Sequence, residues 1–234
     1  MTEKKFIYMD SGATSWPKPQ PVLDAIMEAL TVYGANPGRG AYQMAIRSSR
    51  EIFNARRTIC KFINGDAPER LIFTQNTTEG LNMALQGCLN PGDHVLYSPL
   101  EHNASWRPLT TLSQKGIEIE MLVGDEHGRV SAAEVKAKIK PNTKMLCICH
   151  ASNITGAIQP VKELGAVARE AGILFLVDAA QSAGILPIDV QEMNIDLLAA
   201  PGHKSHGMYK SATCRIPARS GCGFAASFRR RLYW

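Results

Sequence analysis

Asp178 and Lys204 have side chains that could hold a carbonyl cofactor between them. Asp178 directly follows the apolar run 174–177, where an unpaired carboxylate costs free energy. A protonated ring nitrogen is a suitable partner for it. Lys204 offers an amine that, in a partly desolvated pocket, can lose its proton and form an imine with a carbonyl carbon. An aspartate in this position can also simply cap a helix, and most lysines are solvated, so the hypothesis depends on the combination.

A phosphate site is indicated by Thr77 and Thr78, which stand where an apolar run gives way to a helical pattern. The first turn of a helix offers free backbone N–H groups to an anion. The same two residues are also typical of an ordinary helix start. Together with Asp178 and Lys204, they predict a ligand that has both a phosphate and a protonated pyridine nitrogen.

The elements that must position these residues alternate from about residue 67 onward. The sequence predicts strands at 70–74, 94–97, 144–149, 173–177 and 196–200, and helices at 79–88, 104–115 and 161–171. This alternation predicts an α/β fold with a mainly parallel sheet flanked by helices. Ligands in such folds bind beyond the carboxyl ends of the strands. We therefore expect the same sheet edge to gather further polar side chains, namely His102, Asn153, Gln181 and His203.

The chain divides into three parts. Helical patterns at 19–33 and 43–64 flank the Gly/Pro-rich loop 34–40. We expect residues 1–34 to form an N-terminal arm and helix, and 35–204 to form the large cofactor-binding domain. Residues 205–234 have no clear strand or helix period. We interpret them as a basic tail, either poorly ordered or foreign to the fold.

Composition excludes several classes of protein. The 234 residues are 45% hydrophobic and 20% charged, which is typical of a soluble globular protein. The net charge of +5 comes from the tail, which has six basic and no acidic side chains and leaves 20 basic against 21 acidic elsewhere. No apolar run is long enough to span a membrane, and the first residues lack a signal-peptide pattern. We predict a cytosolic protein with free cysteines that binds neither nucleic acid nor membrane.

Two other kinds of site receive little support. The glycine patterns of dinucleotide-binding and P-loop proteins are absent from the sequence. Cys147, Cys149 and His150 could bind a metal, but they end a run with the character of a core strand, so packing is the favoured interpretation and no metal site is predicted.

Several runs of the sequence, in this order and approximate spacing, resemble the class V aminotransferase family. They cover residues 8–14, 74–82, 101–105, 152–156, 177–182 and 201–204. Within that family they are most similar to cysteine desulfurases and selenocysteine lyases. The most specific are Asp-x-x-Gln at 178–181 and Gly-His-Lys at 202–204, and the resemblance extends over residues 6 to about 204.

The resemblance implies pyridoxal 5'-phosphate as the cofactor, held covalently by Lys204. It implies that Asp178 pairs with the pyridine nitrogen, that Gln181 bonds the ring hydroxyl and that His102 stacks on the ring and moves protons. The remaining implied roles are phosphate binding by Thr77, Thr78 and His203, substrate carboxylate placement by Asn153, and lining of the entrance by Ala13 and Arg39.

The implied reaction is removal of sulfur from L-cysteine to give alanine and an enzyme-bound persulfide, with Lys204 moving the α-proton. A homodimer and a sulfur-acceptor protein are implied as partners. The alternatives are a class V aminotransferase, a different pyridoxal-phosphate lyase, or an inactive fragment.

The sequence departs from the family after Lys204. Family members continue with a Gly-rich segment, a nucleophilic cysteine, a carboxylate-binding arginine and a small C-terminal domain. Here residues 205–210 and the basic tail follow instead, so we expect a chain truncated after the cofactor lysine, with neither Cys214 nor Cys222 as the nucleophile. Pro201 stands where many relatives have a serine that binds the phosphate.

Overall fold

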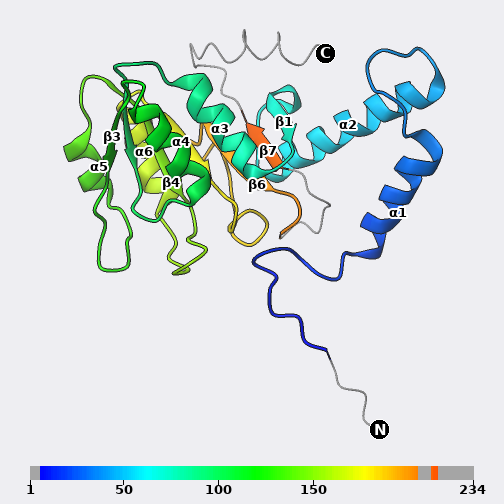
Figure 1. Cartoon of the computed structure of the whole chain (residues 1–234), viewed down its shortest axis with the longest axis horizontal. Helices are drawn as coiled ribbons and strands as arrows, with labels where there is room; N and C mark the ends of the chain where they lie inside the picture. Colours follow the sequence, from blue (N-terminus) through cyan, green and yellow to red (C-terminus); the bar gives the residue numbers. More distant parts are fainter. Residues whose placement is uncertain (1–5, 205–211, 216–234) are drawn as a thin grey trace.

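The computed structural model describes residues 6–204 and 212–215, which form a seven-stranded sheet flanked by helices (Figure 1). Its strands are β1 (Leu71–Thr74), β2 (His94–Tyr97), β3 (Glu118–Met121), β4 (Thr143–Cys149), β5 (Leu174–Asp178), β6 (Leu197–Pro201) and β7 (Ala212–Arg215). The strand order is β1-β7-β6-β5-β4-β2-β3. Neighbouring strands from β6 to β3 pair in parallel, whereas β7 pairs antiparallel with both β1 and β6.

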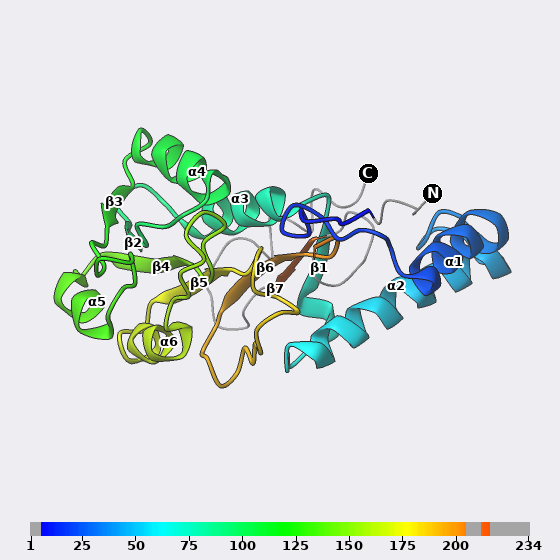
Figure 2. The same cartoon turned by 90° about the horizontal axis from the view of Figure 1, so that it is seen from below.

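The helices precede the sheet or connect its strands. They are α1 (Gln20–Glu28), the π-helical turn η1 (Ala29–Tyr33), α2 (Gln43–Phe62), the 3₁₀ turn η2 (Pro68–Arg70), α3 (Thr77–Cys88), α4 (Asn103–Ser113), α5 (Ala132–Lys138) and α6 (Val161–Glu170). Helices α3 and α4 cover one face of the sheet, and α5 and α6 cover the other (Figure 2). No helix in the described ranges combines the length and apolar character needed to cross a membrane.

The central strands are apolar because helices cover them on both sides. Successive side chains of a strand point to opposite faces. Leu146 and Phe175 therefore pack in the core under α5 and α6, while Cys147 and Leu176 pack in the core under α3 and α4. All of these side chains are fully buried. Two packed cores hold the strand ends of this region in fixed positions.

The predicted strands and helices from residue 43 to 201 are confirmed, with ends that shift by at most two residues. The helix predicted at 19–33 is present as α1 followed by the π-helical η1. Four elements were not predicted, namely the short turn η2, β3, α5 and β7. Strand β3 is a partly exposed edge strand in which charged and apolar residues alternate, and α5 has only seven residues. The prediction of a tail without strands was wrong for Ala212–Arg215, which form β7, and the rest of the tail lies outside the described residues.

Helices α1 and α2 and the turn η1 form an arm that extends away from the sheet (Figures 1 and 2). Helix α1 has no buried residue. Large apolar side chains are exposed along the arm, at Leu23, Met27, Leu30, Val32, Met44, Ile46, Ile52 and Phe53. Exposed apolar side chains gathered in this way are typical of surfaces that associate with another protein.

Candidate active site

A cavity of about 180 Å³ opens where strands β1, β2, β4, β5 and β6 end. Its lining includes every residue for which the sequence predicted a cofactor contact: Thr77, Thr78, His102, Asn153, Asp178, Gln181, His203 and Lys204. Asn76, Ala104, Cys149, Ala151, Ala180 and Pro201 complete the wall. The predicted residues therefore lie together beyond the carboxyl ends of the strands, the edge at which ligands bind in open α/β sheets.

Asp178 forms the acidic part of the cavity wall. It is the last residue of β5 and is only 1% exposed. Its Oδ1 accepts a hydrogen bond from the Ala180 N–H at 2.9 Å. Burial raises the pKa of this carboxyl, while the nearby His102 and Lys204 act in the opposite direction. A buried carboxyl group in the cavity wall is suited to pair with a positively charged ligand atom.

The start of α3 forms the anion-binding part of the wall. Asn76 caps the helix, because its side chain accepts a hydrogen bond from the Glu79 N–H at 2.8 Å. The Glu79 side chain reaches back to accept a hydrogen bond from the N–H of Gln75, the residue before the cap, at 2.6 Å. Thr77 and Thr78 then occupy the first helical positions and line the cavity. A phosphate could bind there to backbone N–H groups and to threonine hydroxyls.

His102 lies at the N-terminus of α4 with its ring held in place. Its Nδ1 accepts a hydrogen bond from the Ala104 N–H at 3.1 Å. Because Nδ1 is the acceptor, the neutral ring carries its proton on Nε2. The ring is therefore fixed both in orientation and in tautomer, which are the properties required of a side chain that stacks on a ligand and transfers a proton.

The segment that carries Lys204 is held by residues from the start of the chain. The carbonyl oxygen of His203 accepts hydrogen bonds from the Ser15 N–H and the Thr14 hydroxyl, both at 3.1 Å. Lys18 Nζ donates to the same carbonyl at 3.2 Å and to the Ser15 carbonyl at 2.7 Å. The sequence prediction missed Lys18, because it lies 185 residues from His203 in the chain.

A second, more open cavity adjoins the first and shares Asn153, Gln181 and Lys204 with it. Ala13, predicted at the entrance, lines this second cavity. Arg39 lies in the exposed loop between η1 and α2 and lines neither cavity. Its predicted role is therefore not supported within this single chain.

Glu101 is a functional candidate that the sequence prediction did not assign. Its Oε1 accepts hydrogen bonds from the Ser98 hydroxyl at 2.7 Å and from the Cys149 N–H at 2.6 Å. These bonds connect the ends of β2 and β4 immediately before His102. Burial raises the pKa of the Glu101 carboxyl to about 7, and the charge of Asp178 adds to that shift.

The buried thiols near Glu101 are part of the core. Cys147 and Cys149 are 0% and 4% exposed. Burial raises the pKa of both thiols, and the carboxyl groups of Glu101 and Asp178 act in the same direction. Both properties oppose thiolate formation, and therefore oppose metal binding and nucleophilic attack. Cys147 and Cys149 are free thiols, as predicted.

Replacing Glu101 with glutamine is expected to change how stability depends on pH. The pKa of Glu101 is about 7 in the folded chain and about 4.3 in an unfolded one. The folded state therefore binds more protons in that interval, and its stability falls as pH rises from about 5 to about 7.5. Glutamine keeps an oxygen that can accept both hydrogen bonds but does not ionise, so Glu101→Gln should lose less stability over this range.

Melting temperatures of the wild-type chain and Glu101→Gln across these pH values test this, with the exposed Glu163→Gln as a matched control. Parallel curves for the wild type and Glu101→Gln would contradict the expectation.

Comparison with known proteins identifies the family. The model of the aminotransferase class-V family matches residues 7–209. A protein of Methanothermobacter thermautotrophicus named probable cysteine desulfurase is 37% identical over 199 residues, which are 85% of this chain and 49% of that protein. The mitochondrial cysteine desulfurase of Saccharomyces cerevisiae is 35% identical, over 86% of this chain and 41% of its own length. The chain thus spans about half the length of the curated relatives it matches.

Solved structures show the same fold. The apo structure of a cysteine desulfurase from Thermococcus onnurineus superposes with a TM-score of 0.84 and 33% identity, over 91% of this chain and 54% of that one. A structure described as SspA in complex with cysteine gives a TM-score of 0.83 with 32% identity, over 89% of this chain and 60% of that one. The predicted fold, a mainly parallel sheet flanked by helices, is confirmed. Because the family model matches most of this chain, the chain belongs to the class-V aminotransferase family.

Proposed function

We propose that the cavity binds pyridoxal 5'-phosphate and that the chain carries the cofactor half of a cysteine desulfurase. The observation that supports this most strongly is the joint lining of one cavity by Lys204, the buried Asp178 and the start of α3. The three groups match an aldehyde, a pyridinium nitrogen and a phosphate respectively. The donor set therefore fits the cofactor, which when bound supplies an electron sink for the substrate α-carbon.

The eight cavity residues predicted to contact the cofactor each have a role in this proposal. Lys204 binds the cofactor covalently and, once released, accepts the substrate α-proton at Nζ. Asp178 pairs with the pyridine N–H, and Gln181 bonds the ring hydroxyl. The fixed ring of His102 stacks on the cofactor. The phosphate is held by Thr77, Thr78 and His203, and Asn153, which lines both cavities, orients the substrate carboxylate.

The proposed substrate is L-cysteine. In the reaction the Cβ–S bond breaks, the sulfur atom passes to a thiolate, and L-cysteine plus a thiol yield alanine plus a persulfide. The buried Cys147 and Cys149 are unsuited to accept the sulfur. The acceptor thiol is therefore a cysteine outside these two, on this protein or on a partner protein.

The test is to supply the chain with pyridoxal phosphate, L-cysteine and dithiothreitol as the sulfur-accepting thiol. We expect sulfide and alanine in equal amounts, and neither from Lys204→Ala. Pyruvate in place of alanine would indicate a different lyase. Amino transfer to a keto acid without sulfide would favour an aminotransferase, and no turnover despite cofactor binding would mean that this chain alone is inactive.

The proposed partners are a second copy of the chain and a sulfur-acceptor protein. The homodimer is supported by the apolar side chains exposed along α1, η1 and α2. An acceptor protein is consistent with a product that remains bound as a persulfide. The cytosolic location stays a prediction.

Removing Lys18 is expected to weaken cofactor binding without removing it. Lys18 holds residues 14–15 and the His203 carbonyl together through four hydrogen bonds. If these contacts contribute about 1 kcal/mol to the free energy of cofactor binding by positioning Lys204, Lys18→Met should bind pyridoxal phosphate about fivefold more weakly. Titration followed by visible absorption measures this, with the exposed Lys115→Met as the control. Equal affinities for Lys18→Met and the wild type would show that these contacts do not position Lys204.

A further inference from the structure

We propose that His94, Glu118 and Glu120 form a second site that binds a Zn²⁺ ion in exchange for the ammonium group of Lys140. His94 and Glu118 are the first residues of β2 and β3, so the site lies at the sheet edge opposite the cofactor cavity. It is independent of the proposed desulfurase activity.

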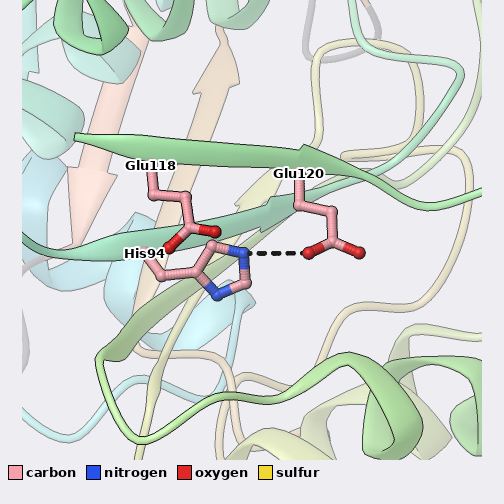
Figure 3. A group of neighbouring side chains, drawn as sticks. All are labelled: His94, Glu118 and Glu120. Carbon is pink, nitrogen blue, oxygen red and sulfur yellow. Dashed lines mark ion pairs between the residues drawn. The ribbon is translucent and has the colours of Figure 1, made fainter. Parts of the chain in front are cut away.

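The strand pairing brings the three side chains together. His94 is the register partner of Glu118 in the parallel ladder of β2 and β3. Glu120 lies two residues further along β3 and so projects on the same face as Glu118. One ligand atom from each residue lies within 4.8 Å of the other two. Figure 3 shows the His94 ring next to the two carboxylates, with the dashed line joining its Nε2 to Glu120.

His94 carries a buried ring nitrogen that its surroundings leave available. The residue is fully buried, and its Nε2 makes no hydrogen bond within the described part of the chain. The nearest carboxylate atom, Glu120 Oε2, is 3.5 Å away. This long ion pair with Glu120 requires a protonated ring, because a carboxylate cannot donate a hydrogen bond. In the neutral ring the Nε2 lone pair has no hydrogen-bond donor among the described residues, which leaves it available to a metal ion.

The other nitrogen of the ring is held in the manner of a metal-binding histidine. Nδ1 lies 2.8 Å from Thr143 Oγ1, which also accepts the Lys140 N–H at 2.7 Å. A hydroxyl oxygen can accept two hydrogen bonds, so Thr143 Oγ1 can also accept one from the Nδ1–H of His94. The Nε2 lone pair then faces the carboxylates, in the arrangement by which outer groups orient a histidine ligand.

The carboxylates of Glu118 and Glu120 already bind a positively charged group, the ammonium of Lys140. Lys140 Nζ lies 2.7 Å from Glu118 Oε1 and 2.6 Å from Glu120 Oε2, and Lys138 Nζ lies 3.2 Å from Glu120 Oε1. Hydrogen bonds from Lys140 lower the pKa of both carboxyls, which keeps them ionised. Both lysines are partly exposed and flexible, so a metal ion can displace the Lys140 ammonium into water.

The donor set favours zinc among divalent ions. One imidazole and two carboxylates match its preference, whereas Ca²⁺ and Mg²⁺ prefer oxygen ligands alone. With Zn–ligand distances near 2.0–2.2 Å, tetrahedral ligand atoms stand about 3.4 Å apart. The 3.5 Å between His94 Nε2 and Glu120 Oε2 already has this value. Once the Lys140 ammonium leaves, Glu118, whose side chain is 49% exposed, can move to close the remaining gap.

Calorimetric titration of the chain with Zn²⁺ tests the proposal in four forms: wild type, His94→Gln, Lys140→Met and the control His127→Gln. His127 is an exposed histidine beside Glu126 and is a match for a histidine–carboxylate pair outside the site. We expect binding in the wild type that is unchanged in His127→Gln and at least tenfold weaker in His94→Gln. Lys140→Met, which removes the competing ammonium, should bind Zn²⁺ about tenfold more tightly than the wild type.

Equal affinity of wild type and His94→Gln would overturn the proposal, since any zinc then binds elsewhere, for example at thiols. Unchanged or weaker binding by Lys140→Met would also overturn it, because exchange with that ammonium is the proposed mode of binding. Lys140 is a surface residue, so this second variant keeps the proposal testable even if loss of the buried His94 ring prevents folding.

Discussion

Lys204→Ala is expected to abolish the visible absorption band that pyridoxal phosphate acquires on binding to the wild-type chain. The band comes from a covalent bond between the cofactor aldehyde and a lysine amine, and Lys204 is the lysine that lines the cavity. The variant keeps Asp178, His102 and the start of α3, so some non-covalent affinity should remain. We therefore expect loss of the band and of all turnover, together with weaker but measurable cofactor binding.

The exposed Lys115→Ala is the matched control, since it removes one lysine far from the cavity lining. It should retain the band at full amplitude. A band of equal strength in Lys204→Ala would show that the aldehyde reacts with other lysines, and the proposed cofactor site would then be wrong.

Asp178→Asn is expected to change stability and function in opposite directions. In the cofactor-free chain, burial raises the pKa of this carboxyl, so the folded state loses stability as pH rises above the unfolded value of about 3.9. Asparagine removes the charge and can keep the bond to the Ala180 N–H. We therefore expect a higher melting temperature for cofactor-free Asp178→Asn at neutral pH.

The same substitution should impair the loaded chain. An amide cannot stabilise a protonated pyridine as a carboxylate does, and a charge-assisted bond of this kind contributes about 3 kcal/mol. That corresponds to a rate of sulfide release about 100-fold lower, together with weaker cofactor binding.

Asp189→Asn is the control, with an expected change in stability opposite to that of Asp178→Asn. Asp189 accepts hydrogen bonds from the Gln191 and Glu192 N–H groups, and these bonds lower its pKa. Its replacement should destabilise the chain while leaving cofactor affinity unchanged. A less stable Asp178→Asn, or one with wild-type activity, would contradict the assigned role of Asp178.

The central strands could be predicted because their burial on both faces requires apolar residues. Strands β4 and β5 are covered by helices on both faces, so they appear as continuous apolar runs. The polar residues at the ends of these two runs then indicate the ligand edge, which is how Asn153 and Asp178 were found. Strand β3 has one neighbour and a partly exposed surface, so its Glu-Ile-Glu-Met sequence carries no comparable signal.

The residues that the sequence did not reveal depend on contacts between distant segments. Glu101 meets the Cys149 N–H only because β2 and β4 pair in parallel. Lys18 meets the His203 carbonyl because the start of the chain folds back over the site. The pairing of His94 with Glu118 likewise requires the register of β2 and β3. Local patterns predict elements and their ends, whereas such contacts require the full topology.

The most direct test of the proposed cofactor site is to reduce the pyridoxal-phosphate-loaded chain with borohydride and map the modified peptides by mass spectrometry. We expect one stoichiometric label, on the peptide that contains Lys204. Comparable labelling of exposed lysines such as Lys115, with Lys204 unmodified, would contradict it.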